Sequence, residues 1–116
     1  MVRQWVPSIL LSAVLCGSVT SCIGRDPPSI SSNDPGRLIP AIEIGVKAND
    51  RHIIPYLISD LESDDSAVRM YSIDGLRRMT GQDFGYVYFA EPEDRRAAVA
   101  RWQEWLLLQP AEPNEK

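Results

Sequence analysis

The chain has 116 residues, sixteen of them acidic and twelve basic, so its formal net charge at pH 7 is −4. This length supports one folded domain. An acidic chain lacks the excess of Lys and Arg that binds phosphates, which argues against nucleic acid as a partner. The same charge balance argues against tight adsorption of the domain itself to anionic lipid headgroups.

Residues 1–21 have the layout of a secretory signal peptide. One positive charge, Arg3, precedes an apolar stretch from Trp5 to about Val19, and small residues follow. The apolar stretch has about 15 residues, fewer than the ~20 that a membrane-spanning helix needs. Two other interpretations stay open, namely an uncleaved anchor and a plain signal peptide that is cut without lipid attachment.

The segment Val19-Thr20-Ser21-Cys22 resembles the lipobox of bacterial lipoproteins, with Val and Thr where Leu and Ala or Ser are commoner. The resemblance implies that the Cys22 thiol carries diacylglycerol and that the chain is cut just before it. Cys16 would leave with the signal peptide, so the mature chain could form no internal disulfide. It would keep eleven basic and sixteen acidic residues, a formal charge of −5.

The resemblance also implies a location. We expect a lipid-anchored protein of the bacterial cell envelope that faces the periplasm or the exterior. Ile23 follows Cys22 where an Asp would signal retention in the inner membrane, so the outer membrane is favoured.

Residues 22–36 are rich in Pro, Ser, Gly and Asp, a composition that buries too little apolar surface to order itself. This composition predicts a flexible tether. Asp34 and Pro35 are suited to cap and begin a helix that follows the tether.

Two short helices are predicted next, within a helical domain that covers residues 37–109. The first helix ends near residue 50, and Pro40 either marks its start or kinks it. The second covers residues 52–62, with Pro55 in a first turn that has no internal donor to lose. The apolar residues of the first helix are Leu38, Ile42, Ile44 and Val46. Those of the second are spaced at three and four, as on one face of an amphipathic helix: Ile53, Ile54, Leu57, Ile58 and Leu61.

Two longer helices complete the predicted domain, and a disordered tail is expected at residues 110–116. Asp65 is placed to cap a helix that begins at Ser66, and Gly81 is suited to end it. The last helix covers residues 92–108, with Pro92 in its first position. Their buried stripes are expected to be Val68, Tyr71, Ser72, Leu76 and Met79, then Val99, Trp102, Trp105 and Leu106. The one strand-like run, residues 86–89, is short and isolated, so the sequence predicts an all-α fold.

Residues 53–76 resemble one HEAT-like repeat of the type found in phycobilisome-lyase-like proteins. The matching features are Ile54-Pro55-Tyr56-Leu57 in the first helix, an acidic turn at Asp64-Asp65, then Val68-Arg69, Ile73 and Leu76 in the second. The resemblance implies that Arg69 bonds acidic or carbonyl groups of a neighbouring turn, with Asp64 or Asp65 as its counterpart, and keeps adjacent repeats in register. Residues 37–50 would be the second helix of an earlier, truncated repeat. Nothing in the sequence indicates a chromophore site, so lyase activity is not inferred.

The segment from Thr80 to Tyr86, together with Arg101-Trp102-Gln103-Glu104-Trp105, resembles a tail that follows the last repeat in some bacterial HEAT-like proteins. In the structural interpretation, Phe84 and Tyr86 fold back onto the repeat, and Trp102 and Trp105 close the open end of a short solenoid. In the functional interpretation, the aromatic residues of the loop form an exposed patch for a partner: Phe84, Tyr86, Tyr88 and Phe89. Capping is favoured because the ends of a solenoid must be covered.

Residues that could carry catalysis or hold a cofactor are scarce. His52 is the single histidine and has no evident nucleophile to activate, so no catalytic residue and no cofactor are expected. Four acids crowd one turn without the spacing of a calcium loop, so no metal site is expected: Asp60, Glu62, Asp64 and Asp65. We therefore expect a non-enzymatic interaction module whose partner is an envelope protein or a second copy. The alternative is a small-ligand or metal-binding accessory subunit of an envelope complex.

Overall fold

The computed structural model describes residues 26–111. The predicted signal peptide, Cys22, the first residues of the predicted tether and the end of the predicted tail lie outside this range. The described residues form four α-helices and one short 3-10 helix, without a strand: α1 (Pro35–Lys47), η1 (Arg51–Ile53), α2 (Ile54–Asp60), α3 (Ser66–Thr80) and α4 (Pro92–Leu107). The all-α prediction is thus confirmed for this part of the chain, and residues 86–89 belong to a loop.

Capping residues close to each end determine where α1 begins and where α3 begins and ends. The Asp34 carboxylate accepts a hydrogen bond from the Gly36 N–H at 3.0 Å, so α1 begins at Pro35 and the last two residues of the predicted tether are helical. Pro40 lies inside α1 and does not mark its start. The Asp65 carboxylate caps α3, and Gly81 ends α3 with a φ of 74°, as predicted.

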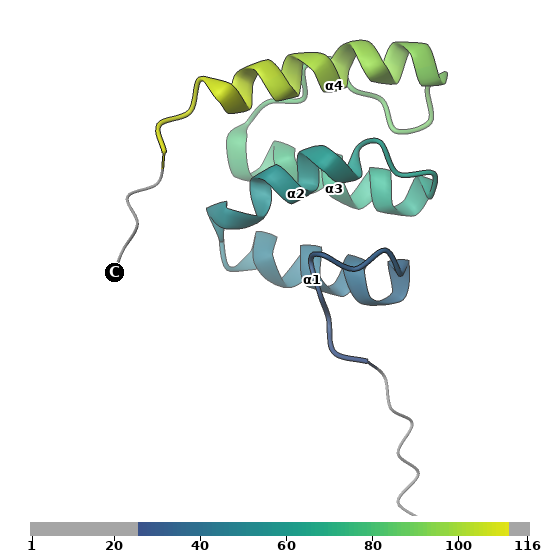
Figure 1. Cartoon of the computed structure of the whole chain (residues 1–116), viewed down its shortest axis with the longest axis vertical. Coiled ribbons are helices and arrows are strands. Elements are labelled where there is room, and N and C mark those ends of the chain that lie inside the picture. Colours follow the sequence, from purple (N-terminus) through teal and green to yellow (C-terminus); the bar gives the residue numbers. More distant parts are fainter. Residues whose placement is uncertain (1–25, 112–116) are drawn as a thin grey trace, which may run out of the picture.

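The helices lie in two layers (Figure 1). The short α2 lies in front of α3, and α4 lies above α2, whereas α1 lies below α3 in the rear layer. α3 packs against both α1 and α2, and α2 contacts α4. The close approach of α1 and α3 depends on Gly75, because a Cβ there would lie 2.8 Å from Cγ2 of Val46.

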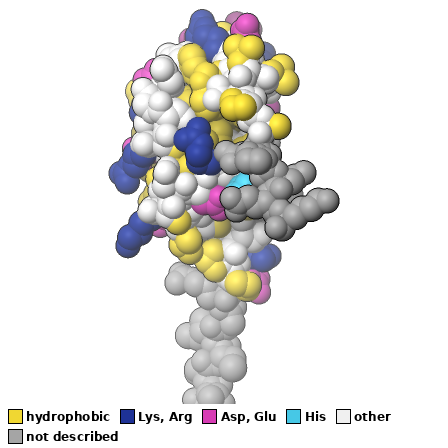
Figure 2. Space-filling view, turned by 90° about the vertical axis from the view of Figure 1, so that its left-hand side faces the viewer, with side chains coloured by type: hydrophobic (Ala, Val, Ile, Leu, Met, Phe, Trp, Pro, Cys, Tyr) yellow, Lys and Arg dark blue, Asp and Glu magenta, His cyan; other side chains and the backbone are white. Residues whose placement is uncertain are grey.

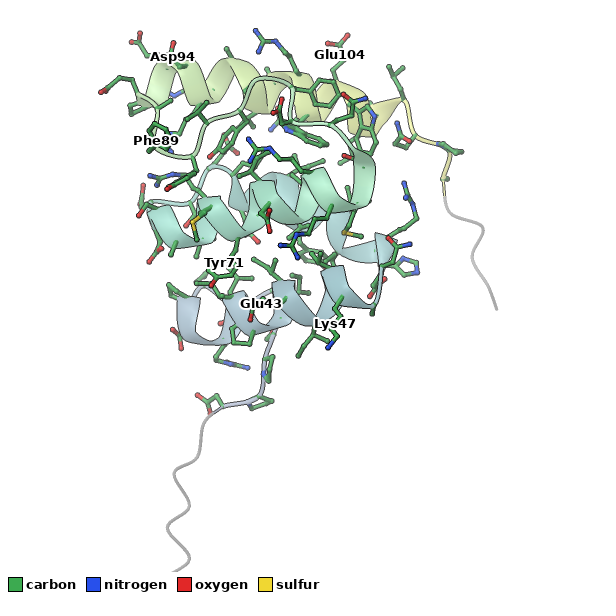
Figure 3. The ribbon with its side chains drawn as sticks, turned by 180° about the vertical axis from the view of Figure 1, so that it is seen from behind. Glu43, Lys47, Tyr71, Phe89, Asp94 and Glu104 are labelled. Carbon is green, nitrogen blue, oxygen red and sulfur yellow. The ribbon has the colours of Figure 1, made fainter. Side chains whose placement is uncertain are left out.

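Two non-helical segments complete these layers. Residues 27–33 cross in front of α1, on the side of α2 (Figure 1). They are held by two hydrogen bonds, from the Ser29 N–H to the Arg37 carbonyl and from Arg37 Nε to the Pro27 carbonyl, both 3.1 Å long. The second segment is the loop between α3 and α4, residues 81–91, which we call the aromatic loop; seen from behind, it passes in front of α4 and beside α3 (Figure 3).

A single core joins the layers and the two segments. Its fully buried large side chains come from α1, α2, α3, the aromatic loop and α4: Ile42, Leu57, Leu61, Val68, Ile73, Leu76, Tyr86 and Trp102. The apolar face predicted for residues 52–62 is confirmed, since all five of its residues are buried. Ile44, an apolar residue of α1, does not belong to this core, because its side chain is 60% exposed. Ile44 follows Ile42 by two positions, which places it on the opposite side of α1, where no described element covers it.

Candidate functional site

The main chain of the aromatic loop is held by side chains of α3 and α4. Five of its carbonyl groups accept a hydrogen bond from a side chain of these helices: Tyr88 from Arg69 Nε at 2.9 Å, Tyr86 from Arg77 Nη2 at 3.4 Å, Phe84 from Arg101 Nη1 at 3.0 Å, Ala90 from Arg95 Nε at 3.1 Å, and Asp83 from Trp102 Nε1 at 3.2 Å. Hydrogen bonds from a charged donor are stronger than neutral ones. The loop is therefore an anchored part of the fold.

The side chains of the aromatic loop alternate between the core and the solvent. Phe84, Tyr86 and Tyr88 pack against the core, whereas Val87 is 38% exposed and Phe89 is 75% exposed. The Tyr86 hydroxyl donates a hydrogen bond of 2.6 Å to the Leu61 carbonyl, and burial raises the pKa of the Tyr86 phenol above its usual value. Of the four aromatic residues suggested as a binding patch, Phe89 alone is largely exposed.

Phe84 and the two tryptophans of α4 form an aromatic cluster. The rings of Phe84 and Trp102 meet edge to face with centroids 4.7 Å apart, and those of Trp102 and Trp105 do so at 5.4 Å. Phe84 is placed by a tight turn in which it has a φ of 52° and Gly85 a φ of 76°. Trp102 is fully buried and Trp105 is partly buried. Neither Tyr86 nor Trp102 is therefore accessible to a partner.

Arg69 links the turn before α3 to the aromatic loop. Its Nη1 donates to the carbonyls of Ser63 at 2.7 Å and Asp64 at 3.0 Å, while its Nε reaches Tyr88. The counterpart of Arg69 is thus the main chain of Asp64, and neither the Asp64 nor the Asp65 carboxylate pairs with it in the described structure. The Asp65 carboxylate instead accepts from the N–H groups of Ala67 and Val68.

Asp60 is the most perturbed titratable group of the described residues. Its Oδ2 atom is buried and has no hydrogen-bond partner in this part of the chain. Burial raises the pKa of the Asp60 carboxyl from its usual 3.8 to about 6. The carboxyl borders a hollow of about 470 Å³ between the segment before α1 and the turn before α3. The other charged residues that line this hollow are all acidic: Glu62, Asp64 and Asp65. Among residues 26–111, no group of three or more His, Cys, Asp or Glu side chains is placed to hold a metal ion.

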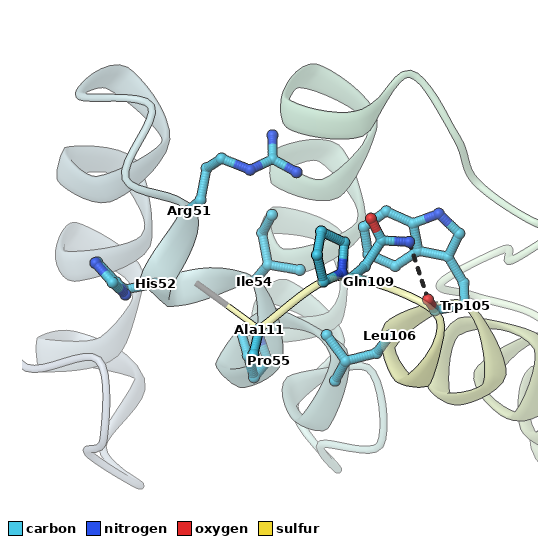
Figure 4. A pocket seen from close by; sticks show the side chains of 9 residues that line it. Arg51, His52, Ile54, Pro55, Trp105, Leu106, Gln109 and Ala111 are labelled. Carbon is cyan, nitrogen blue, oxygen red and sulfur yellow. Dashed lines mark hydrogen bonds between the residues drawn. The ribbon is translucent and has the colours of Figure 1, made fainter. Parts of the chain in front are cut away.

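A cleft of about 270 Å³ opens where α2 begins and α4 ends (Figure 4). We call it the end cleft; its described lining is Arg51, His52, Ile54, Pro55, Trp105, Leu106, Gln109, Pro110 and Ala111. Gln109 is held by a hydrogen bond of 3.1 Å from its Nε2 to the Trp105 carbonyl. Figure 2 looks onto this end of the molecule and shows hydrophobic side chains gathered over its upper part, with Lys and Arg side chains between them.

The end cleft was not predicted from the sequence. Its walls come from segments about fifty residues apart, and Ile54, Trp105 and Leu106 were assigned to the core. One signal was available, since Leu106, Leu107 and Leu108 form an apolar run at the end of a helix. Leu107 and Leu108 are 85% and 77% exposed, beside the cleft.

Comparisons with protein-family models, with curated proteins and with solved structures find no significant match. No helix in residues 26–111 is long and apolar enough to span a bilayer. In the same range, no hydrogen bond joins His52 to a hydroxyl group.

Proposed function

We propose that the chain is a lipid-anchored, non-enzymatic interaction module of the bacterial cell envelope, built on a short HEAT-like solenoid. The lipid is attached to Cys22, as the lipobox-like sequence before it indicates. Confinement to a membrane raises the effective concentration of the module for a partner at the same membrane. The partner binds at the end cleft.

The two-layer arrangement supports the HEAT-like part of the proposal. In this interpretation α2 and α3 are the helix pair of one repeat, α1 is the second helix of the preceding repeat, and α4 is the first helix of the next. Two helices would then be missing, one at each end. Residues 27–33 lie beside α1 and the aromatic loop lies beside α3. Each missing helix is thus replaced by a non-helical segment whose main-chain carbonyls accept hydrogen bonds from arginine side chains. Covered ends are what a repeat fold needs for solubility.

The observation that carries the interaction function is the end cleft. Its apolar walls are Ile54, Pro55, Trp105 and Leu106, and Arg51 and His52 lie on one rim. Arg51 forms no ion pair with any described residue. An apolar cleft bordered by polar rim groups is typical of a protein-binding surface. In a chain of net charge −4, an unpaired cation beside this surface favours a partner segment that carries apolar and carboxylate side chains.

A site-specific crosslink tests this surface. A photoreactive amino acid at Gln109, on the rim of the end cleft, should capture one defined envelope protein after irradiation of intact cells. A matched reporter at Arg96, an exposed position of α4, should not capture it. Adding Arg51→Glu should lower capture at Gln109 at least fivefold, whereas Arg96→Glu should leave it unchanged.

The anchor is tested separately by fractionation. The wild-type chain should remain with membranes after a high-salt wash, and Cys22→Ala should release it. If Cys22→Ala stays membrane-bound, or if Gln109 and Arg96 capture the same proteins, the corresponding half of the proposal is wrong. A stabilising shift in melting temperature with a small envelope metabolite, without protein capture, would instead favour an accessory subunit that binds a small ligand in this cleft.

A further inference from the structure

The outer face of α1 differs in charge from the rest of the protein. Helical periodicity places the side chains of six exposed or half-buried residues around Ile44 on the side away from the core: Arg37, Pro40, Ala41, Ile44, Lys47 and Ala48. This face, which we call the α1 outer face, carries two cations, and the exposed acid Glu43 borders it, one helical turn before Lys47. Asp26 and Asp34 are acids of the segment that precedes it.

The segment that leads to Cys22 leaves the structure beside this same face. Arg37 belongs to the α1 outer face, and its Nε holds the Pro27 carbonyl at 3.1 Å. Ser29 bonds the Arg37 carbonyl, and Ile30 packs against the core, so the described contacts of the fold reach back to Pro27. In Figure 1 the chain departs from the α1 end of the molecule, opposite α4.

The remaining length is short. Pro27 is the fifth residue after Cys22, and a fully extended chain spans at most ~3.6 Å per residue, so the two residues lie at most about 18 Å apart. If the chain made no contact with the fold before residue 36, the distance from Cys22 to the fold could reach about 50 Å by the same measure. An acyl chain on Cys22 therefore keeps α1 close to the lipid headgroups.

We propose that the α1 outer face is a membrane-contact surface that rests on the bilayer holding the Cys22 lipid. This inference rests on the lipid anchor of the proposed function. Ile44 and Pro40 contact the headgroup boundary, and Arg37 and Lys47 lie level with lipid phosphates, the arrangement of an interfacial amphipathic helix. The acyl chain supplies the affinity, and the α1 outer face fixes the orientation.

The charge distribution favours this orientation over the reverse. Residues 22–49 contain three basic and three acidic residues, whereas residues 50–111 contain seven basic and eleven acidic ones. An anionic bilayer repels the second part and tolerates the first. With α1 on the bilayer, α4 faces away from it, and the end cleft opens to the side where a partner can approach.

The orientation is testable by energy transfer on the full-length acylated chain. The thiol of an acylated Cys22 is blocked and Cys16 leaves with the signal peptide, so one introduced cysteine is a unique labelling site. Fluorescent donors are placed at three exposed positions through Ile44→Cys on α1, Tyr56→Cys on α2 and Leu107→Cys on α4. The protein is then inserted into vesicles of phosphatidylcholine and phosphatidylglycerol that contain a headgroup-labelled acceptor lipid.

Transfer should be strongest at position 44 and weakest at position 107, because α1 and α4 are separated by two helix-packing distances of about 10 Å each. Lys47→Glu should lower transfer from position 44 at least twofold on anionic vesicles. The same charge change in Arg96→Glu, on α4, should leave that transfer unchanged. Equal transfer from the three positions, or strongest transfer at 107, overturns the inference.

Flotation separates this inference from the proposed function. If the wild-type chain floats with the vesicles and Cys22→Ala does not, the anchor holds, and the donor ranking alone decides the orientation. If neither chain floats, both the anchor and the membrane-contact surface are wrong.

Discussion

The Asp60 carboxyl should make the stability of the fold depend on pH. Asp60 ends α2, and its buried Oδ2 has no donor among the described residues. Burial raises the pKa of this carboxyl from 3.8 to about 6. The folded protein therefore holds the Asp60 proton more tightly than the unfolded chain does. Its contribution to stability is complete below pH 3.8 and is lost as the pH rises through about 6.

The magnitude follows from the pKa shift. One pKa unit corresponds to about 1.4 kcal/mol, so a shift of about 2 units sets an upper limit of about 3 kcal/mol. Asp60 is only partly buried, and contact with water screens the ionised form, so we expect about 1–2 kcal/mol. The substitution Asp60→Asn removes the ionisation. The advantage of the variant over the wild type in unfolding free energy should therefore grow by about 1 kcal/mol between pH 4.5 and pH 7.5.

Urea unfolding followed by helical circular dichroism at several pH values measures this difference. The comparison across pH removes any constant effect of the amide on packing. Glu104→Gln, at an exposed position of α4, is the matched control, and its difference from the wild type should not change with pH. If the Asp60→Asn difference is the same at every pH, the carboxyl is not desolvated in the folded protein and the reasoning fails.

Three further substitutions test the aromatic loop and its anchors. Tyr86→Phe leaves the Leu61 carbonyl without its donor at 2.6 Å, so the unfolding free energy should fall by about 1–3 kcal/mol in urea titrations; an unchanged midpoint would contradict the bond. Arg69→Lys keeps the charge, but a lysine cannot bond three carbonyls from one planar group. The unfolding free energy should therefore fall by about 2–3 kcal/mol, and amide exchange in the loop should become faster. Arg96→Lys should behave as the wild type. Gly81→Ala adds a Cβ in open space at a φ of 74°, so backbone strain alone should cost about 1 kcal/mol, and a rise in melting temperature would refute this explanation of the helix end.

The helix ends were predictable because their causes are local. Asp34 and Asp65 each cap a helix by accepting N–H groups two or three residues later, and Gly81 ends α3 through its own φ. Pro92 begins α4 as predicted. These features depend on a few neighbouring residues, which a single sequence contains in full.

The surface of α1 and the anchoring of the aromatic loop depend on distant residues. Ile44 has the apolar character of a core residue, and its exposure follows only from the absence of a described element on that side of α1. Arg77 and Arg95 gave no signal in the sequence, since an arginine that will bond a carbonyl looks like any other surface arginine. Arg101 belongs to the tail-like pattern of α4, but that pattern assigned it no contact with the loop. Arg69 was singled out because the HEAT-like resemblance assigns it a role.

Most of the basic side chains stabilise the fold, and two of those that do not lie on the two proposed surfaces. In residues 26–111, six of the nine basic side chains bond a main-chain carbonyl or pair with an acid: Arg37, Arg69, Arg77, Arg78, Arg95 and Arg101. The other three have no such partner in the described structure: Lys47, Arg51 and Arg96.

These unpartnered cations mark outward surfaces of an acidic molecule. Lys47 lies on the α1 outer face, and Arg51 lies on the rim of the end cleft. Charge reversal at the two sites should therefore separate the two functions. Lys47→Glu should weaken the orientation on vesicles and spare crosslinking at Gln109, whereas Arg51→Glu should do the reverse. If either substitution impaired both readouts equally, the two surfaces would not act independently.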